Sequence, residues 1–182
     1  MTTNSHSLEN ISEQNIILIG MPTSGKSSAG VILAKILGLD FVDTDLLIQK
    51  RENRKLHEIL SEEDLNVFLR IEEDVCLSLD EKGSVIATGG SVVYGEKAMA
   101  HLKSLGIVVY LEIDFDTLTK RLHNVKQRGV VLREGQTIRD LYEERKLLYS
   151  KYADITVSEA GLDMEETVDS IRKGVVIYQS RK

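Results

Sequence analysis

One stretch near the N-terminus has residue types and spacing suited to binding a nucleoside triphosphate. Residues 20–27, Gly-Met-Pro-Thr-Ser-Gly-Lys-Ser, follow an apolar run and match the pattern G-x-x-x-x-G-K-[ST]. In such a loop backbone N–H groups surround phosphate oxygens, an approach that disfavours a Cβ at Gly20 or Gly25. Lys26 would reach the terminal phosphates, and the Ser27 hydroxyl would bind Mg²⁺. The stretch is therefore predicted to be a P-loop.

Two carboxylates separated by one residue follow the next predicted strand. Residues 39–45 end in Asp43 and Asp45, and ligands of open parallel sheets gather beyond the carboxyl ends of the strands. Near bound Mg·ATP, one acid could hold the metal through its waters. The other could orient a substrate hydroxyl or accept its proton. Alternatively, either acid could simply cap the helix expected to begin at residue 46.

Two further loops could complete a site for phosphoryl transfer. Gly89 and Gly90 follow an apolar strand at 84–88, and paired glycines there either let an acceptor approach the backbone or form a tight turn. Residues 126–136 contain three basic residues and two glycines. A loop of this kind can close over a triphosphate, bring an arginine to it and exclude water. An ordinary charged surface loop is the alternative.

Composition narrows the class of partner. The 29 acidic and 23 basic residues give a net charge of −6, which opposes binding to nucleic acid or anionic lipid. The sequence has neither an apolar run long enough for a bilayer nor a signal-peptide pattern, so we expect a cytoplasmic protein without membrane partners. The single cysteine, Cys76, lies in an apolar-periodic segment and is expected to be a buried hydrophobe.

Alternating strands and helices must position these loops. The expected strands are residues 16–19, 39–45, 84–88, 107–111 and 155–157. The expected helices are 27–37, 95–105, one from an Asp114 or Asp116 cap to about 123, 137–149 and 164–178. Residues 46–82 show no strand signal and are interpreted as a helical acceptor-binding insertion. The pattern predicts a doubly wound α/β fold with a parallel sheet.

The domain organisation follows from the same pattern. Residues 1–14 are polar without a helical or alternating period and are expected to be a disordered tail. Residues 15–182 are expected to form one domain, with the helical region at 46–82 and a mobile lid at 124–136.

Taken in order, the motifs resemble those of the shikimate kinase family, within the nucleoside-monophosphate-kinase-like P-loop group. They are the P-loop, Asp43-Thr44-Asp45, Phe68 to Glu72, Ala87 to Gly90, the Arg128 loop and Arg145 to Tyr149, and the resemblance covers roughly residues 15–178. It implies a five-stranded sheet in the order 2-3-1-4-5, ATP and Mg²⁺. It also implies transfer of a phosphoryl group to a small-molecule hydroxyl, by default that of shikimate in aromatic amino-acid biosynthesis. We expect a monomer.

The resemblance also implies a role for each site residue. Lys26, the candidate base Asp45 and the lid arginine Arg128 would be catalytic, and Asp43 would join Ser27 at the metal. The residues around ATP would be Gly20, Thr23, Ser24, Gly25, Lys26, Ser27, Ser28, Arg121 and Arg128, with Arg121 packed on the adenine. The acceptor would meet Asp45, Leu69, Gly89, Gly90 and Arg145, with Arg145 pairing with its carboxylate.

Three positions depart from the family pattern. Leu69 stands where an arginine is usual, Ser91 replaces a third glycine, and Gly129 replaces a proline after the lid arginine. Arg70 is rotated from position 69 by about 100° on a helix. Losing a buried arginine–carboxylate contact typically costs a few kcal/mol, or roughly a hundredfold in affinity. Two further hypotheses are therefore a kinase for another hydroxylated acceptor and a non-catalytic nucleotide-binding regulator.

Overall fold

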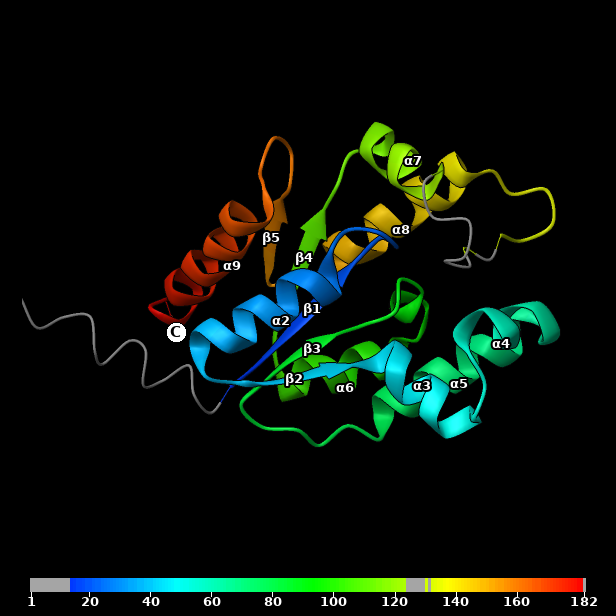
Figure 1. Cartoon of the computed structure of the whole chain (residues 1–182), viewed down its shortest axis with the longest axis horizontal. Helices are drawn as coiled ribbons and strands as arrows, with labels where there is room; N and C mark the ends of the chain where they lie inside the picture. The colour runs from blue at the N-terminus through cyan, green and yellow to red at the C-terminus, as the bar shows by residue number, and fades with distance from the viewer. Residues whose placement is uncertain (1–13, 124–129, 131, 182) are drawn as a thin grey trace, which may run out of the picture.

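A five-stranded parallel sheet lies at the centre of the chain, in the order β2-β3-β1-β4-β5 (Figure 1). The structure is a computed structural model, and it describes residues 14–123, 130 and 132–181. Its strands are β1 (Asn15–Gly20), β2 (Asp40–Asp43), β3 (Ser84–Ala87), β4 (Gly106–Glu112) and β5 (Ile155–Ser158). All four pairings are parallel. The predicted fold class and strand order are confirmed.

Helices cover both faces of this sheet. In chain order the helices of the described residues are α2 (Lys26–Leu37), α3 (Thr44–Glu52), α4 (Leu56–Glu62), α5 (Leu65–Leu77), the 3₁₀ helix η1 (Val92–Tyr94), α6 (Glu96–Leu105), α7 (Phe115–His123), α8 (Ile138–Tyr152) and α9 (Met164–Gln179). Most predicted bounds agree within one or two residues. The sequence pattern missed η1, which is a single short turn.

The core lies in two layers because successive strand residues point to opposite faces. Ile16 and Leu18 of β1 pack with α2 and α9 on one face of the sheet. Ile17, Ile19 and Tyr110 pack with α5, α6 and α8 on the other. β1 is buried along its whole length, as a central parallel strand should be. The P-loop that follows β1 therefore starts from a fixed point.

The helical insertion predicted at 46–82 consists of α3, α4 and α5, which lie together beside the carboxyl ends of β2 and β3 (Figure 1). Asn53 ends α3 in the left-handed region at φ 50°, and the Asp64 side chain caps α5. The last helix ends at Leu77, with Ser78 as its C-cap, rather than at residue 82, and the chain then reaches β3 through Gly83 at φ 60°. A small apolar cluster around Ile48, Ile59 and Phe68 holds the three helices together.

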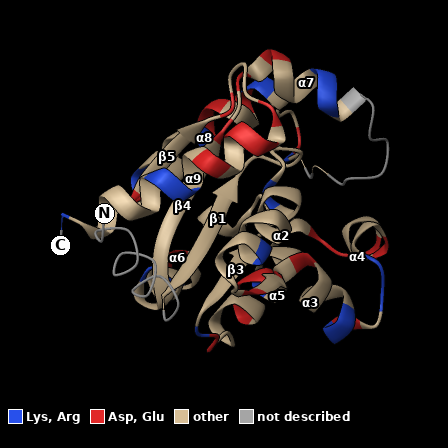
Figure 2. Cartoon of the chain, turned by 60° about the vertical axis from the view of Figure 1, so that its left-hand side comes forward, with Lys and Arg blue, Asp and Glu red and all other residues tan. Residues whose placement is uncertain are grey.

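Acidic and basic residues are interspersed along the helices in the view of Figure 2. The buried Cys76 thiol belongs to the core, and burial raises its pKa above the usual range. This burial fits the predicted role of a small hydrophobe. Within the described residues, no helix combines the length and apolar character needed to cross a bilayer. Residues 1–13 of the predicted tail lie outside the described residues.

Candidate active site

The loops after β1, β2 and β3 meet at the carboxyl edge of the sheet, because these strands are neighbours in it. With α8 and the insertion they enclose a cavity of about 340 Å³. Predicted site residues along its wall are Thr23, Gly25, Lys26, Ser27, Ser28, Asp43, Asp45, Gly89, Gly90 and Arg145. Chain topology thus brings together in one cavity most of the residues that the motifs singled out.

Lys26 is folded back onto its own loop. Its ammonium donates hydrogen bonds to the carbonyl oxygens of Gly20 at 2.9 Å and Met21 at 2.8 Å. The residue is only 7% exposed, and burial lowers the pKa of Lys26 from 10.5 to about 8, partly opposed by the charges of Asp45 and Glu159. An ammonium held in so little water interacts strongly with any anion that enters the cavity.

The backbone of the loop is conformationally demanding at three positions. Gly20 and Gly25 have φ values of 151° and 77°, and Thr23 adopts φ 68°, which is uncommon for a β-branched residue. A Cβ at Gly20 would lie 2.6 Å from the carbonyl oxygen of Leu111. Gly20 is therefore required because Leu111 of β4 lies against it, and Gly25 is favoured because of its positive φ. Strained loop geometry of this kind is typical of functional sites.

Asp43 connects the P-loop to the second strand. One of its carboxylate oxygens accepts a hydrogen bond from the Ser27 hydroxyl at 2.7 Å. The other accepts from the backbone N–H of Asp45 at 3.0 Å and so caps α3. The two alternatives for Asp43, a cap or a group near the metal, are therefore compatible. The paired hydroxyl and carboxylate oxygens suit Mg²⁺, a hard cation.

Gly89 lies between two acids. A Cβ on it would collide with Glu72 Oε1 and would lie 3.0 Å from Asp45 Oδ1. Its backbone N–H donates to the buried hydroxyl of Thr44 at 3.1 Å, which joins the β2 and β3 loops. The glycine is thus needed for a close approach by acidic side chains of the site. The sequence predicted either an approach by the acceptor or a tight turn; acidic side chains make the close approach at Gly89, and the chain turns at Gly90 and Ser91.

Glu72 of α5 is a buried acid that lines the cavity. It is 1% exposed, and its Oε2 accepts a hydrogen bond from the Ser91 hydroxyl at 2.6 Å. Its Oε1 has no hydrogen-bond partner among the described residues. Burial is the largest cause of a Glu72 pKa raised from 4.5 to about 7, and the charge of Asp45 adds to it. Its hydrogen-bond partner is thus Ser91, while the nearby charges of Arg145 and Lys26 oppose the rise of its pKa.

We expect Glu72→Gln to stabilise the fold at alkaline pH. A raised folded-state pKa means that the wild type loses stability as pH rises from about 4.5 to about 7. At about 1.4 kcal/mol per pKa unit, the loss is on the order of 3 kcal/mol. Glutamine does not ionise, so the variant does not lose this stability. In urea unfolding, the free energy of unfolding of the variant relative to that of the wild type should be higher at pH 8 than at pH 5.

Glu143→Gln is the control for this comparison, because Glu143 is exposed on α8 and loses little hydration on folding. Its stability difference from the wild type should be the same at both pH values. A Glu72→Gln difference that is also independent of pH would contradict a raised pKa for Glu72.

Arg145 of α8 is a second buried cation of the cavity, besides Lys26. It is 3% exposed, its Nε donates to the Tyr94 hydroxyl at 3.4 Å, and its guanidinium lies 5.2 Å from the Tyr94 ring. One turn later, the Tyr149 hydroxyl donates to the Gly90 carbonyl oxygen. Helix α8 therefore fixes both the cation and the glycine loop. Nothing in local patterns pointed to Tyr94 or Tyr149 as contacts of these groups.

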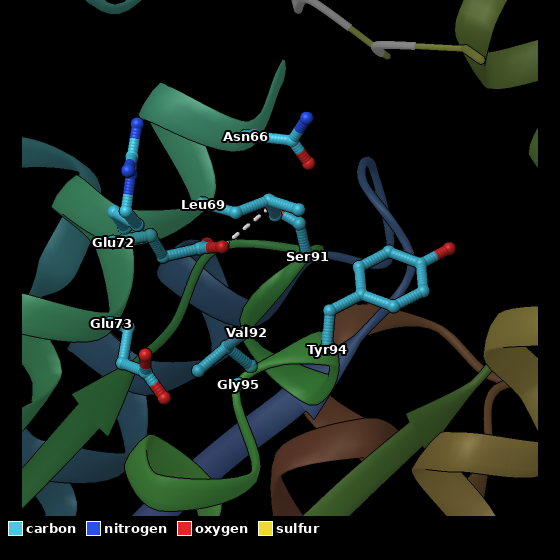
Figure 3. A pocket seen from close by; sticks show the side chains of 9 residues that line it. Asn66, Leu69, Glu72, Glu73, Ser91, Val92, Tyr94 and Gly95 are labelled. Carbon is cyan, nitrogen blue, oxygen red and sulfur yellow. Dashed lines mark hydrogen bonds between the residues drawn. The ribbon is translucent and has the colours of Figure 1, made fainter.

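A second cavity of about 500 Å³ adjoins the first and shares Glu72 and Ser91 with it. Leu69 lines this second cavity rather than the first, so the structure does not put it beside Arg145 in the first cavity. Figure 3 shows Leu69 reaching from α5 toward Ser91, with Tyr94 on the other side. Arg70 is exposed and lines the second cavity only. Leu69 and Arg70 thus share the second cavity, and neither of them lines the first.

Two predicted nucleotide contacts remain. Arg121 donates to the carbonyl oxygen of Thr23 and to Glu159 Oε2, both at 2.9 Å, and so anchors α7 to the P-loop. Glu159, after β5, was not found by motif reasoning; its only signal is its place beyond a strand end. Arg128 and Gly129 of the predicted lid lie outside the described residues.

A parallel sheet of this order, with a P-loop after its central strand, two acids at the end of β2, a glycine pair after β3 and a cation from α8, defines a P-loop kinase. The family model for shikimate kinase matches residues 22–175. This match spans most of the chain. The chain therefore belongs to the shikimate kinase family, and it is a phosphotransferase.

Two shikimate kinases are among the relatives, and they agree with this assignment. The shikimate kinase of Aquifex aeolicus is 38% identical over 143 residues, which cover 78% of this chain and 84% of that protein. A shikimate kinase from Acinetobacter baumannii, solved in complex with shikimate, has a TM-score of 0.82 at 30% identity and covers 97% of this chain and 98% of its own. Mouse threonine synthase-like 1 is 36% identical over 177 residues, or 96% of this chain but 23% of that protein.

Proposed function

We propose that the protein transfers the γ-phosphoryl group of ATP to a hydroxyl of shikimate. The observation that carries this proposal is the family match over residues 22–175, together with one cavity that joins Lys26, Asp45 and Arg145. A phosphate-binding loop, a carboxylate and a buried cation are the groups that a hydroxylated acid and ATP require. The relatives named as shikimate kinases do not favour a different acceptor or a non-catalytic regulator.

The nucleotide would lie on the P-loop. Lys26 would exchange its two carbonyl partners for phosphate oxygens, which are stronger acceptors because they are charged. Ser27 would bind Mg²⁺ directly and Asp43 would hold a metal-bound water, since Mg²⁺ usually keeps several waters. No three His, Cys, Asp or Glu side chains among the described residues form a metal cage. A metal held mainly by phosphates and a hydroxyl fits that donor set.

The acceptor would lie between the glycine loop and α8. Arg145 would pair with its carboxylate, and Asp45 would hold the reacting hydroxyl and accept its proton as the bond to phosphorus forms. Gly89 and Gly90 would line the acceptor with backbone. We likewise propose that Arg128 contacts the phosphates as the lid arginine and that Arg121 packs on the adenine. In the described structure Arg121 is engaged with Thr23 and Glu159.

A coupled ADP-release assay tests the function directly. With Mg·ATP and millimolar shikimate, we expect turnover well above the rate without acceptor, and mass spectrometry should find a singly phosphorylated shikimate. A chelator in excess of Mg²⁺ should stop the reaction. Turnover equal to the control without acceptor would overturn the assignment of shikimate. A panel of hydroxylated acids and polyols would then identify the acceptor.

A further inference from the structure

The acceptor site has one buried arginine where its family pattern has two. Arg145 is supplied by α8, while position 69 on α5 holds a leucine. A carboxylate bound by one guanidinium keeps part of its charge and lone pairs unmatched, which costs affinity in a cavity with little water. A second cation that reaches the same point would have to come from another part of the chain.

Arg133 lines neither cavity, but it contacts Tyr94, which lines the second one. Its guanidinium carbon lies 5.3 Å from the centre of the Tyr94 ring, and that of Arg145 lies 5.2 Å from the same centre. A single aromatic ring thus carries two arginines from different parts of the chain, and the attraction of each is of the cation–π type. Tyr94 itself lines the cavity beside Leu69 (Figure 3). The ring brings Arg133 to the edge of the region that lacks an arginine at 69.

The other contacts of Arg133 would not prevent it from turning to a ligand. Its guanidinium pairs with Glu144 at 3.1 Å, and the two side chains are 54% and 34% exposed. Exposed pairs of this kind contribute little stability, because water and salt screen them. Glu144 also accepts a hydrogen bond from Gln136 at 2.9 Å, so it would keep a partner if Arg133 moved.

We propose that Arg133 is the second arginine for the acceptor carboxylate and that Tyr94 aligns it with Arg145; this rests on the proposed function. The carboxylate would lie between the two guanidinium groups. Tyr94 would hold them near one another when the acceptor is absent, although like charges repel. In this arrangement the charge missing at position 69 of α5 is restored from the segment before α8.

The test compares Arg133→Ala with the wild type in steady-state kinetics. We expect the KM for shikimate to rise about tenfold, the effect of losing one charged hydrogen bond at a partly exposed site, with kcat and the KM for ATP nearly unchanged. Arg133→Lys should recover part of the loss, because it keeps the charge without the planar fork. With shikimate methyl ester, which has no carboxylate charge, the wild type and Arg133→Ala should have the same KM.

Arg139→Ala is the matched control, since Arg139 also stacks on an aromatic ring, that of Phe115 at 3.9 Å, but Phe115, unlike Tyr94, lines neither cavity. It should leave the KM for shikimate unchanged. A second arm uses Leu69→Arg: in that background the effect of Arg133→Ala should shrink to roughly twofold, because α5 then supplies the missing cation.

The outcomes separate the two proposals. Turnover of shikimate with the same KM in Arg133→Ala and the wild type overturns the role of Arg133 and leaves the function standing. An equal rise in KM for shikimate and its methyl ester also overturns it, because the effect would then not involve the carboxylate. No turnover by the wild type contradicts the proposed function, and the role of Arg133 fails with it.

Discussion

Lys26→Met is expected to lower kcat about a thousandfold, because preorganised charge usually contributes more than any other effect to the catalysis of phosphoryl transfer. The ammonium sits in a nearly dry cavity, where its interaction with the charge of the transferring group is weakly screened. Methionine has a similar length and no charge. The loss should appear mainly in kcat, measured at saturating ATP and shikimate.

The fold should survive this substitution. Burial disfavours the charged form of Lys26, as its lowered pKa of about 8 indicates, so an apolar side chain of the same shape removes a desolvation cost. It also removes hydrogen bonds to the carbonyl oxygens of Gly20 and Met21. Thermal unfolding should therefore change only modestly.

Lys35→Met is the matched control, because Lys35 lies on the same helix but is exposed in its last turn. It should keep full activity. If Lys26→Met retained more than about a tenth of the wild-type kcat, a P-loop role for Lys26 would be wrong, since single groups of this kind contribute at least a hundredfold.

The sequence predicts best those parts of the site whose contacts are local. The P-loop could be identified because its lysine bonds to carbonyl oxygens five and six residues earlier, within the motif itself. Asp43 was predicted either to cap a helix or to lie near the metal. One oxygen of its carboxylate caps α3, and the other accepts a hydrogen bond from Ser27. Periodicity also sufficed for the sheet, since β1 and β4 are nearly continuous apolar runs.

Contacts between distant segments could not be predicted in the same way. The hydrogen bond from Ser91 to Glu72 joins residues 19 apart, and that from Tyr149 to Gly90 joins residues 59 apart. Both depend on how α5 and α8 pack on the edge of the sheet, which no spacing rule encodes. Leu69 is an example: the sequence showed that the arginine usual at this position was absent, but not which residue could replace it. Only the packing around Tyr94 indicates where a replacement could come from.

Asp45→Asn is the second substitution expected to have a large effect, a fall in kcat of about a hundredfold or more. An amide can still hydrogen-bond the acceptor hydroxyl, but it cannot accept the proton that leaves it. We therefore expect kcat to fall much more than the KM for shikimate rises, while at pH 6, where Lys26 keeps its proton, the KM for ATP stays close to its original value. Asp40→Asn, at the exposed start of β2, should have no effect.

The same substitution should also change how binding of ATP depends on pH, and this distinguishes an electrostatic role from simple distortion. The charge of Asp45 raises the pKa of Lys26, against the larger effect of burial. Without that charge, the pKa of Lys26 in the free enzyme falls further below about 8, so more of the lysine is neutral at pH 8. Binding of Mg·ATP, measured by calorimetry from pH 6 to pH 9, should therefore weaken at a lower pH in Asp45→Asn than in the wild type. Identical pH profiles would mean that Asp45 and Lys26 do not interact, and would contradict a shared site.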